Sequence, residues 1–163
     1  MGNISSILQR LTAAGAEKLI VVNLPDLGKT PGGAANPNQS AGLTQLSTAH
    51  NQALRASLQT LAQSQPNVNI IPIDINELLN EVIADPARFG FTNVTQPCIS
   101  SGANCDQFLF WDQLHPTARA HSIISQYALD ILTAPQTIVP QGDIALGVAR
   151  RPTLDLNGRL VTL

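Results

Sequence analysis

The hydrophobic positions in the first part of the chain recur at helical intervals. Near-helical spacing separates four apolar residues close to the start: Ile4, Leu8, Leu11 and Ala14. This pattern predicts a helix over residues 4–14, ended by Gly15, a residue suited to the left-handed cap of a helix. A longer set of six positions at intervals of three and four predicts a second helix over residues 43–64: Leu43, Leu46, His50, Leu54, Leu58 and Leu61. Between them, clustered proline and glycine predict an irregular loop over residues 25–40.

Two more helices are predicted further along the chain. One follows Asp74, whose carboxylate can cap it, and ends before the Asp85-Pro86 pair. The other begins at Pro116, since proline is favoured at the first helical position, and ends by Ala134. On this prediction His115 occupies the N-cap of the last helix.

Two short continuous apolar runs have the form of strands buried on both faces of a parallel sheet. They are residues 18–23 (KLIVVN) and 69–73 (NIIPI). Residues 86–109 show no clear period. The alternation of helix and strand predicts an α/β fold with a parallel sheet covered on both faces. Only two strands are evident, whereas doubly wound sheets have about five or six, so part of the sheet is expected to be missing from this sequence.

Length and charge limit the number of domains and the kinds of partner that this chain can have. The 163 residues suffice for one domain or for part of a larger one, predicted as residues 1–134 followed by a tail or linker over 135–163. A net charge of −2 gives no basic field for nucleic acid. No apolar run approaches the roughly 20 residues needed to span a bilayer. Asparagine and glutamine outnumber charged residues, which favours a secreted or cell-surface protein whose export signal lies outside this sequence.

The most specific chemical feature is an aspartate three positions before a histidine. The carboxylate of Asp112 can curl back to accept a hydrogen bond from the ring of His115. Such a bond fixes the tautomer of the ring and leaves its other nitrogen free to act as a general base. The alternative is a histidine that only caps the helix, with Asp112 exposed; spacing alone does not decide between the two.

Three stretches of the sequence resemble the SGNH or GDSL esterases and lipases. FWDQLHPTARAH resembles the block of that family in which the aspartate and histidine of a Ser-His-Asp triad lie three residues apart. AGAEKLIVVNLPDLGKTP and DINELLNEVIADPARFGFTNVTQPC are similar to other segments of these enzymes. The resemblance covers residues 4–134 and points to the branch of secreted bacterial lipases, phospholipases and autotransporter esterases.

The resemblance implies a three-layer α/β/α, flavodoxin-like fold and the hydrolysis of an ester or lipid substrate without metal or cofactor. Asp112 would orient the ring of His115, and His115 would be the general base of acyl transfer. The family's nucleophile lies in a Gly-Asp-Ser-Leu block, and its oxyanion donors include the asparagine of a Gly-x-Asn-Asp block; neither block occurs here. We therefore expect the C-terminal portion of such an enzyme, inactive alone, with the N-terminal half as its partner.

A serine within the chain could replace the missing nucleophile, but no strand-to-helix elbow presents one of the candidates: Ser100, Ser101, Ser122 and Ser125. Two other classes of function stay open. The chain could be a non-catalytic domain that keeps the fold and binds glycan or lipid, or a segment without a function of its own.

The two cysteines and the residues beside the Asp-His pair complete the candidate site. In a chain similar to secreted enzymes, a disulfide between Cys98 and Cys105 is the favoured interpretation. A zinc site that also uses His115 or His121 is the alternative. Otherwise His121 is expected to pack against the body of the protein. Trp111 could line an acyl pocket, or it could pack in the core beneath the loop.

Overall fold

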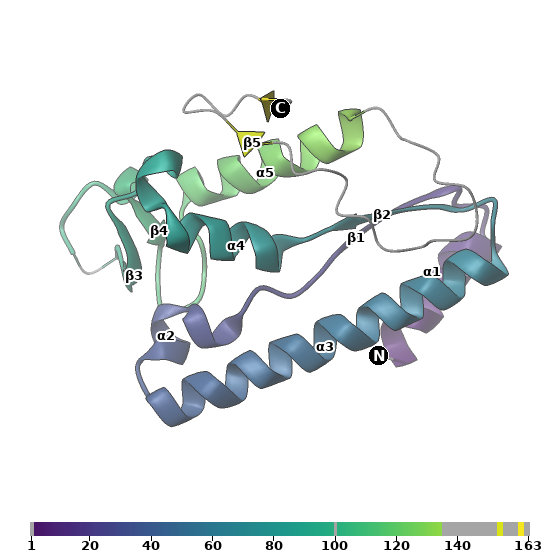
Figure 1. The fold of residues 1–163 in the computed structure, drawn as a ribbon, viewed down its shortest axis with the longest axis horizontal. Coiled ribbons are helices and arrows are strands. Elements are labelled where there is room, and N and C mark those ends of the chain that lie inside the picture. The colour runs from purple at the N-terminus through teal and green to yellow at the C-terminus, as the bar shows by residue number, and fades with distance from the viewer. Residues whose placement is uncertain (1, 100, 135–152, 155–159, 162–163) are drawn as a thin grey trace.

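The computed structural model describes residues 2–99, 101–134, 153–154 and 160–161. Helices and parallel strands alternate over most of this length (Figure 1). The helices are α1 (Gly2–Ala13), α2 (Pro31–Ala34), α3 (Pro37–Ser64), α4 (Ile75–Ala84) and α5 (Ala118–Thr133). The strands are β1 (Lys18–Val22), β2 (Asn69–Ile73), β3 (Asn93–Pro97), β4 (Phe108–Phe110), β5 (Thr153–Leu154) and β6 (Leu160–Val161). Three short 3₁₀ helices join them: η1 (Leu27–Lys29), η2 (Pro86–Phe89) and η3 (Cys105–Gln107). The predicted α/β class is confirmed.

β1 and β2 form a parallel pair in the middle of a layered arrangement. Lys18 pairs with Asn69 and Val22 with Ile73, and the ladder continues through the Asn23 N–H to the Ile73 carbonyl. α1 and α3 cover one face, where a core forms from these buried side chains: Leu8, Leu19, Val21, Leu54, Leu58 and Leu61. α5 lies on the other side and contacts β2, as Figure 1 shows.

β1 is buried on one face only, which corrects the prediction that this strand is covered on both. Its burial alternates, with Leu19 and Val21 inside, while Ile20 and Val22 are 51% and 54% exposed. In β2, by contrast, Ile71 and Ile73 are buried on that second side. Within the described residues β1 pairs only with β2, so one edge of β1 is open there, and Ile20 and Val22 on its second face are exposed.

The predicted loop over residues 25–40 contains two helix starts instead. Thr30 caps α2 with Pro31 as the first helical residue, and Asn36 caps α3 with Pro37 in the same place. Proline breaks a helix in its interior but favours the first turn, where its missing N–H has no partner to lose. α3 therefore begins at Pro37, well before the predicted residue 43.

Other helix ends follow the sequence signals. Gly15 has φ +96° after α1, and the Ala16 N–H bonds to the Leu11 carbonyl, as in a left-handed helix cap. Asp74 caps α4 by accepting from the Glu77 N–H. α5 begins at Ala118, with Thr117 as its N-cap, so the predicted start at Pro116 is corrected.

A second parallel pair lies in the region without a clear period. β3 pairs with β4, Asn93 opposite Phe108 and Pro97 opposite Phe110, with an irregularity between these positions. The irregular register and the terminal proline remove the alternation that would mark a strand in the sequence. Behind this pair α4 and α5 enclose a second core, whose buried members include Leu79, Phe91 and Leu109.

The predicted tail over residues 135–163 lies mostly outside the described residues. Of it the structure describes β5 and β6, which pair antiparallel. None of the helices in the described ranges has the length and apolar character needed to cross a membrane.

The packing predicts that two leucines of α3 contribute very differently to the free energy of unfolding. Leu54 is 3% exposed in the core under β1, whereas Leu46 is 60% exposed. We expect Leu54→Ala to lower the free energy of unfolding by about 2–5 kcal/mol, because it leaves a cavity. Leu46→Ala should change it by no more than about 0.5 kcal/mol. Urea unfolding of both variants tests this, and equal losses would contradict the described packing.

Candidate catalytic site

The loop between β4 and α5 carries the Asp-His pair and is closed at its base by backbone bonds. The Trp111 N–H donates to the His115 carbonyl at 2.8 Å, and Phe110 forms a bridge with Pro116. Below them, the Thr117 N–H donates to the Leu109 carbonyl at 3.0 Å. These bonds fold residues 111–116 into a small closed turn at the end of β4.

Thr117 fixes the other end of the loop. Its buried hydroxyl donates to the Phe108 carbonyl at 2.7 Å and accepts from the Ala120 N–H at 3.2 Å. One side chain thus joins β4 to the first turn of α5. Because Thr117 and not His115 is the N-cap, His115 lies two residues before the helix cap, which corrects its predicted position.

Asp112 organises the interior of the turn. Its Oδ1 accepts from the backbone N–H groups of Leu114 at 2.8 Å and His115 at 2.6 Å. Its Oδ2 lies 2.8 Å from Nδ1 of the His115 ring. The predicted contact between the two side chains therefore exists, and the backbone of the turn contributes two further donors to the carboxylate.

These donors lower the pKa of Asp112. The backbone N–H groups of His115 and then Leu114 have the largest effect, followed by the His115 side chain, and together they bring the pKa from 3.8 to about 2. A carboxylate that accepts several N–H bonds is stabilised in its charged form. Asp112 is therefore ionised throughout the neutral range and can hold the His115 ring in one orientation.

The ring of His115 is open to solvent. Its side chain is 70% exposed, and among the described residues its ring bonds only to Asp112. With Nδ1 directed at Asp112, Nε2 is left without a bonding partner in the described part of the chain. An imidazole held in this way can accept a proton at Nε2 from a hydroxyl or water molecule within hydrogen-bond distance.

A disulfide supports the strand next to the loop. Cys98 and Cys105 are bonded, with 5.5 Å between their Cα atoms, as predicted. The sulfurs are bonded to each other and are not available to a metal, and His121 is exposed, so the zinc alternative fails and the predicted packing of His121 is wrong. Cys98 donates its N–H to the Phe110 carbonyl and Ile99 donates to that of Trp111.

The two aromatic residues before Asp112 have opposite surroundings. Phe110 is buried in the second core, whereas Trp111 is 44% exposed. Core packing of Trp111 is therefore excluded, and its ring is available at the surface beside the Asp-His loop.

Comparison with known proteins now identifies the family. Residues 1–128 match the family described as GDSL-like lipase/acylhydrolase. The chain belongs to this family. "Lipase 1" of Photorhabdus luminescens is 36% identical over 119 residues, 65% of this chain. "Esterase EstA" of Pseudomonas aeruginosa is 34% identical over 152 residues, 83% of this chain.

The GDSL relatives are much longer than this chain. The matched stretch covers 18% of Lipase 1 and 23% of Esterase EstA. A GDSL esterase/lipase of Arabidopsis thaliana is 27% identical over 143 residues, 75% of this chain, and 36% of its own length is covered. The chain thus spans about a fifth to a third of the curated relatives it matches.

None of the serines among the described residues forms a hydrogen bond with the His115 ring of this GDSL chain. Ser101 Oγ donates to the Cys98 carbonyl, and Ser122 Oγ donates to the Ala118 carbonyl. Ser100 lies outside the described residues. The given sequence contains no Gly-Asp-Ser block.

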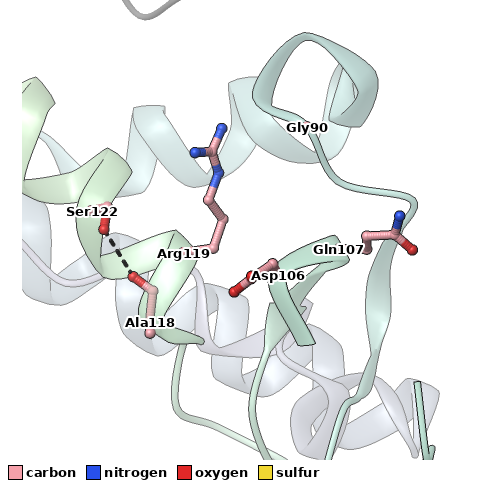
Figure 2. Close-up of a pocket in the computed structure, with 6 residues that line it drawn as sticks. All are labelled: Gly90, Asp106, Gln107, Ala118, Arg119 and Ser122. Atoms are coloured by element: carbon pink, nitrogen blue, oxygen red, sulfur yellow. Dashed lines mark hydrogen bonds between the residues drawn. The ribbon is translucent and has the colours of Figure 1, made fainter. Parts of the chain in front are cut away.

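An open pocket lies beside the first turn of α5, apart from the Asp-His pair. Figure 2 shows the Arg119 side chain rising from α5, with Gly90, Asp106 and Gln107 to its right. Arg119 donates to the Phe89 carbonyl at 3.4 Å. Neither Asp112 nor His115 lines this pocket, so it adds nothing to the candidate site.

Two contributors to the site were not predicted from the sequence. Leu114 contributes through its backbone N–H. The sequence signal for this contact is the tendency of aspartate to accept hydrogen bonds from N–H groups two and three residues later. Thr117 acts as a helix cap and as a tie to β4. The sequence signal for this cap is a hydroxyl residue directly before a run of helix-forming residues. Pro116, one residue earlier, is the more obvious place for the helix to begin.

The pKa of Asp112 gives a direct test of the turn. A carbon-detected NMR titration should show its carboxyl titrating at about 2. In His115→Ala the pKa should rise but stay below 3.8, because the two backbone donors are retained and have the larger effects. Since the pKa is lowered by folding, any stabilisation by Asp112 is complete above its ordinary pKa and is lost as the pH falls toward 2. His121→Ala is the matched control and should leave the titration unchanged; an ordinary pKa in the wild type would contradict the described turn.

Proposed function

We propose that this chain supplies the base and its orienting carboxylate to a Ser-His-Asp ester hydrolase. The observation that carries the proposal is the 2.8 Å contact between His115 Nδ1 and Asp112 Oδ2, with the rest of the ring exposed. Membership of the GDSL-like lipase/acylhydrolase family and the names of the relatives support an ester or lipid substrate.

The proposed mechanism uses His115 twice. In the first half-reaction Nε2 accepts the proton of a serine hydroxyl as its oxygen attacks the ester carbonyl, and then delivers that proton to the leaving alcohol. In the second half-reaction Nε2 accepts a proton from water, which attacks the acyl-serine, and returns it to the serine. Asp112 holds the ring and stabilises the imidazolium formed in each step.

The serine and the oxyanion donors are proposed to come from polypeptide that this sequence does not contain. The absence of Gly-Asp-Ser and Gly-x-Asn-Asp blocks supports this, as does the open edge of β1 with the exposed Ile20 and Val22. An uncovered apolar strand at a sheet edge is suited to pairing with another strand. We assign that partner as the N-terminal half of the same hydrolase domain.

Two finer features belong to the same proposal. Trp111, exposed next to Asp112, is proposed to contact the acyl or alcohol part of the substrate. The Cys98–Cys105 disulfide and the scarcity of lysine support a secreted or cell-surface location, because disulfides persist in oxidising compartments.

The first test uses the complete protein, with its serine block, and a short-chain p-nitrophenyl ester. We expect turnover, and we expect His115→Ala to lower kcat by up to about 10⁶-fold, the loss found when a triad base is removed. His121→Ala, an exposed histidine of α5, should retain full activity. Unchanged turnover in His115→Ala would refute the assignment of the base. Specific binding of lipid or glycan without hydrolysis would favour the non-catalytic alternative.

The second test asks whether the 163-residue chain contains an activated serine. A fluorophosphonate probe reacts with a serine only when a base and oxyanion donors act on it. We expect no labelling of this chain, and labelling of the complete protein. Stoichiometric labelling of the chain alone, lost in Ser101→Ala or Ser122→Ala, would mean that a local serine serves as the nucleophile.

A further inference from the structure

A helix from the first third of the chain touches the Asp-His loop. Gly32 is a residue of α2, and its backbone N–H donates a hydrogen bond to the Gln113 carbonyl at 2.8 Å. Gln113 follows Asp112 directly and lies two residues before His115. Figure 1 shows the connection from β4 to α5 running down to α2. Among the described residues, this is the hydrogen bond that ties residues 112–115 to an element outside the segment from β4 to α5.

Hydrogen bonds hold α2 in place through Thr30 and through η1, the 3₁₀ helix directly before it. Thr30 caps it by accepting from the Gly33 N–H and donates its own hydroxyl to the Leu27 carbonyl at 2.8 Å. Leu27 in turn donates its N–H to the hydroxyl of Ser47, a buried residue of α3. Ser40, also of α3, donates to the Gly28 carbonyl at 2.9 Å. The long helix therefore fixes η1, Thr30 joins η1 to α2, and α2 contacts the loop.

The approach of α2 to the loop leaves little room for a side chain at position 32. A Cβ placed there would lie 3.1 Å from the Gln113 carbonyl oxygen and 3.3 Å from the Gln113 Cβ. Gly32 is not among the glycines with positive φ in the described chain, so its backbone does not itself require glycine. Glycine is favoured here by the close approach of two backbones.

We propose that Gly32 is a positioning residue for the Asp112–His115 pair, setting the place of the loop through its bond to Gln113. The inference rests on the proposed function, because it assigns Gly32 a part in that reaction. The backbone bonds close the turn on itself, but they do not determine where the turn stands relative to the β1 side of the molecule. The bond from Gly32 ties the turn to that side, so we expect a side chain at position 32 to displace His115 relative to the proposed serine.

The test compares substitutions at Gly32 with the same substitutions at Gly42. Gly42 lies on α3, and an added Cβ there would meet no atom within 4 Å beyond the backbone of its own helix and its chain neighbours. Placement errors near 1 Å can cost about 100-fold in rate, so we expect kcat of the complete protein to fall about 10-fold in Gly32→Ala and about 100-fold in Gly32→Val. KM should change by less than about twofold, because the substrate contacts are retained. Gly42→Ala and Gly42→Val should keep the wild-type kcat.

A second readout needs no activity. In the 163-residue chain the carboxyl of Asp112 should titrate at about 2 in the wild type and in the Gly42 variants. In Gly32→Val the added side chain presses on Gln113, which lies between Asp112 and its two N–H donors, so these bonds should lengthen and the pKa should move toward 3.8. Thermal unfolding shows whether the variants fold; if Gly32→Val does not, the milder Gly32→Ala decides.

The possible outcomes are distinct. Wild-type kcat and an unchanged Asp112 titration in the folded Gly32 variants would overturn the proposal, as would a loss that appears only in KM. If the complete protein hydrolyses no ester while the titration moves in the Gly32 variants alone, the positioning contact stands and the proposed reaction fails. If hydrolysis occurs and the Gly32 variants match the Gly42 variants, the reaction stands and the positioning role fails.

Discussion

The candidate site depends on one carboxylate that holds a turn of backbone and a ring together. Asp112 accepts two backbone N–H groups at Oδ1 and contacts the His115 ring at Oδ2. Because the backbone of His115 and its side chain bond to the same carboxylate, the position of the ring is set by a short local structure. A spacing of three residues is what permits this, since the chain must turn back within reach of a two-oxygen group. The ring is oriented although it is mostly exposed.

The turn orients Asp112 and His115 relative to each other, and the surrounding elements determine the position of the turn in the fold. β4 is only three residues long, but all three are buried, and Leu109 and Phe110 anchor the start of the loop in the second core. Thr117 anchors the end through the Phe108 carbonyl. The disulfide-bonded segment adds the bonds from Cys98 and Ile99 to β4 and Trp111. The site therefore lies where a buried strand passes abruptly into an exposed turn.

The elements that could be predicted from the sequence are those with regular periods or local signals. Leu54, Leu58 and Leu61 mark the buried face of α3, and Asp74 and Gly15 mark helix ends through interactions within a few residues. The elements that escaped prediction depend on distant partners. β3 includes a proline and an irregular register, and it is a strand only because β4 lies beside it. The starts of α2 and α3 were hidden because proline breaks or begins a helix according to its position in the turn.

The same division applies to the site. The Asp112–His115 contact could be predicted because it is local, whereas the contact from Gly32 joins residues far apart in the sequence and leaves no pattern in either segment. That long-range contact also relates the Asp-His pair to the open edge of β1. α2 lies in the connection that follows β1, so the carboxyl end of that strand leads toward the loop.

A further strand added in parallel at the edge of β1 would end on the same side as β1 does. In open α/β sheets the residues that follow such strand ends form the site. On the proposed function, a strand added at this edge is what brings a serine toward His115. Completion of the sheet and of the proposed catalytic group would then occur together.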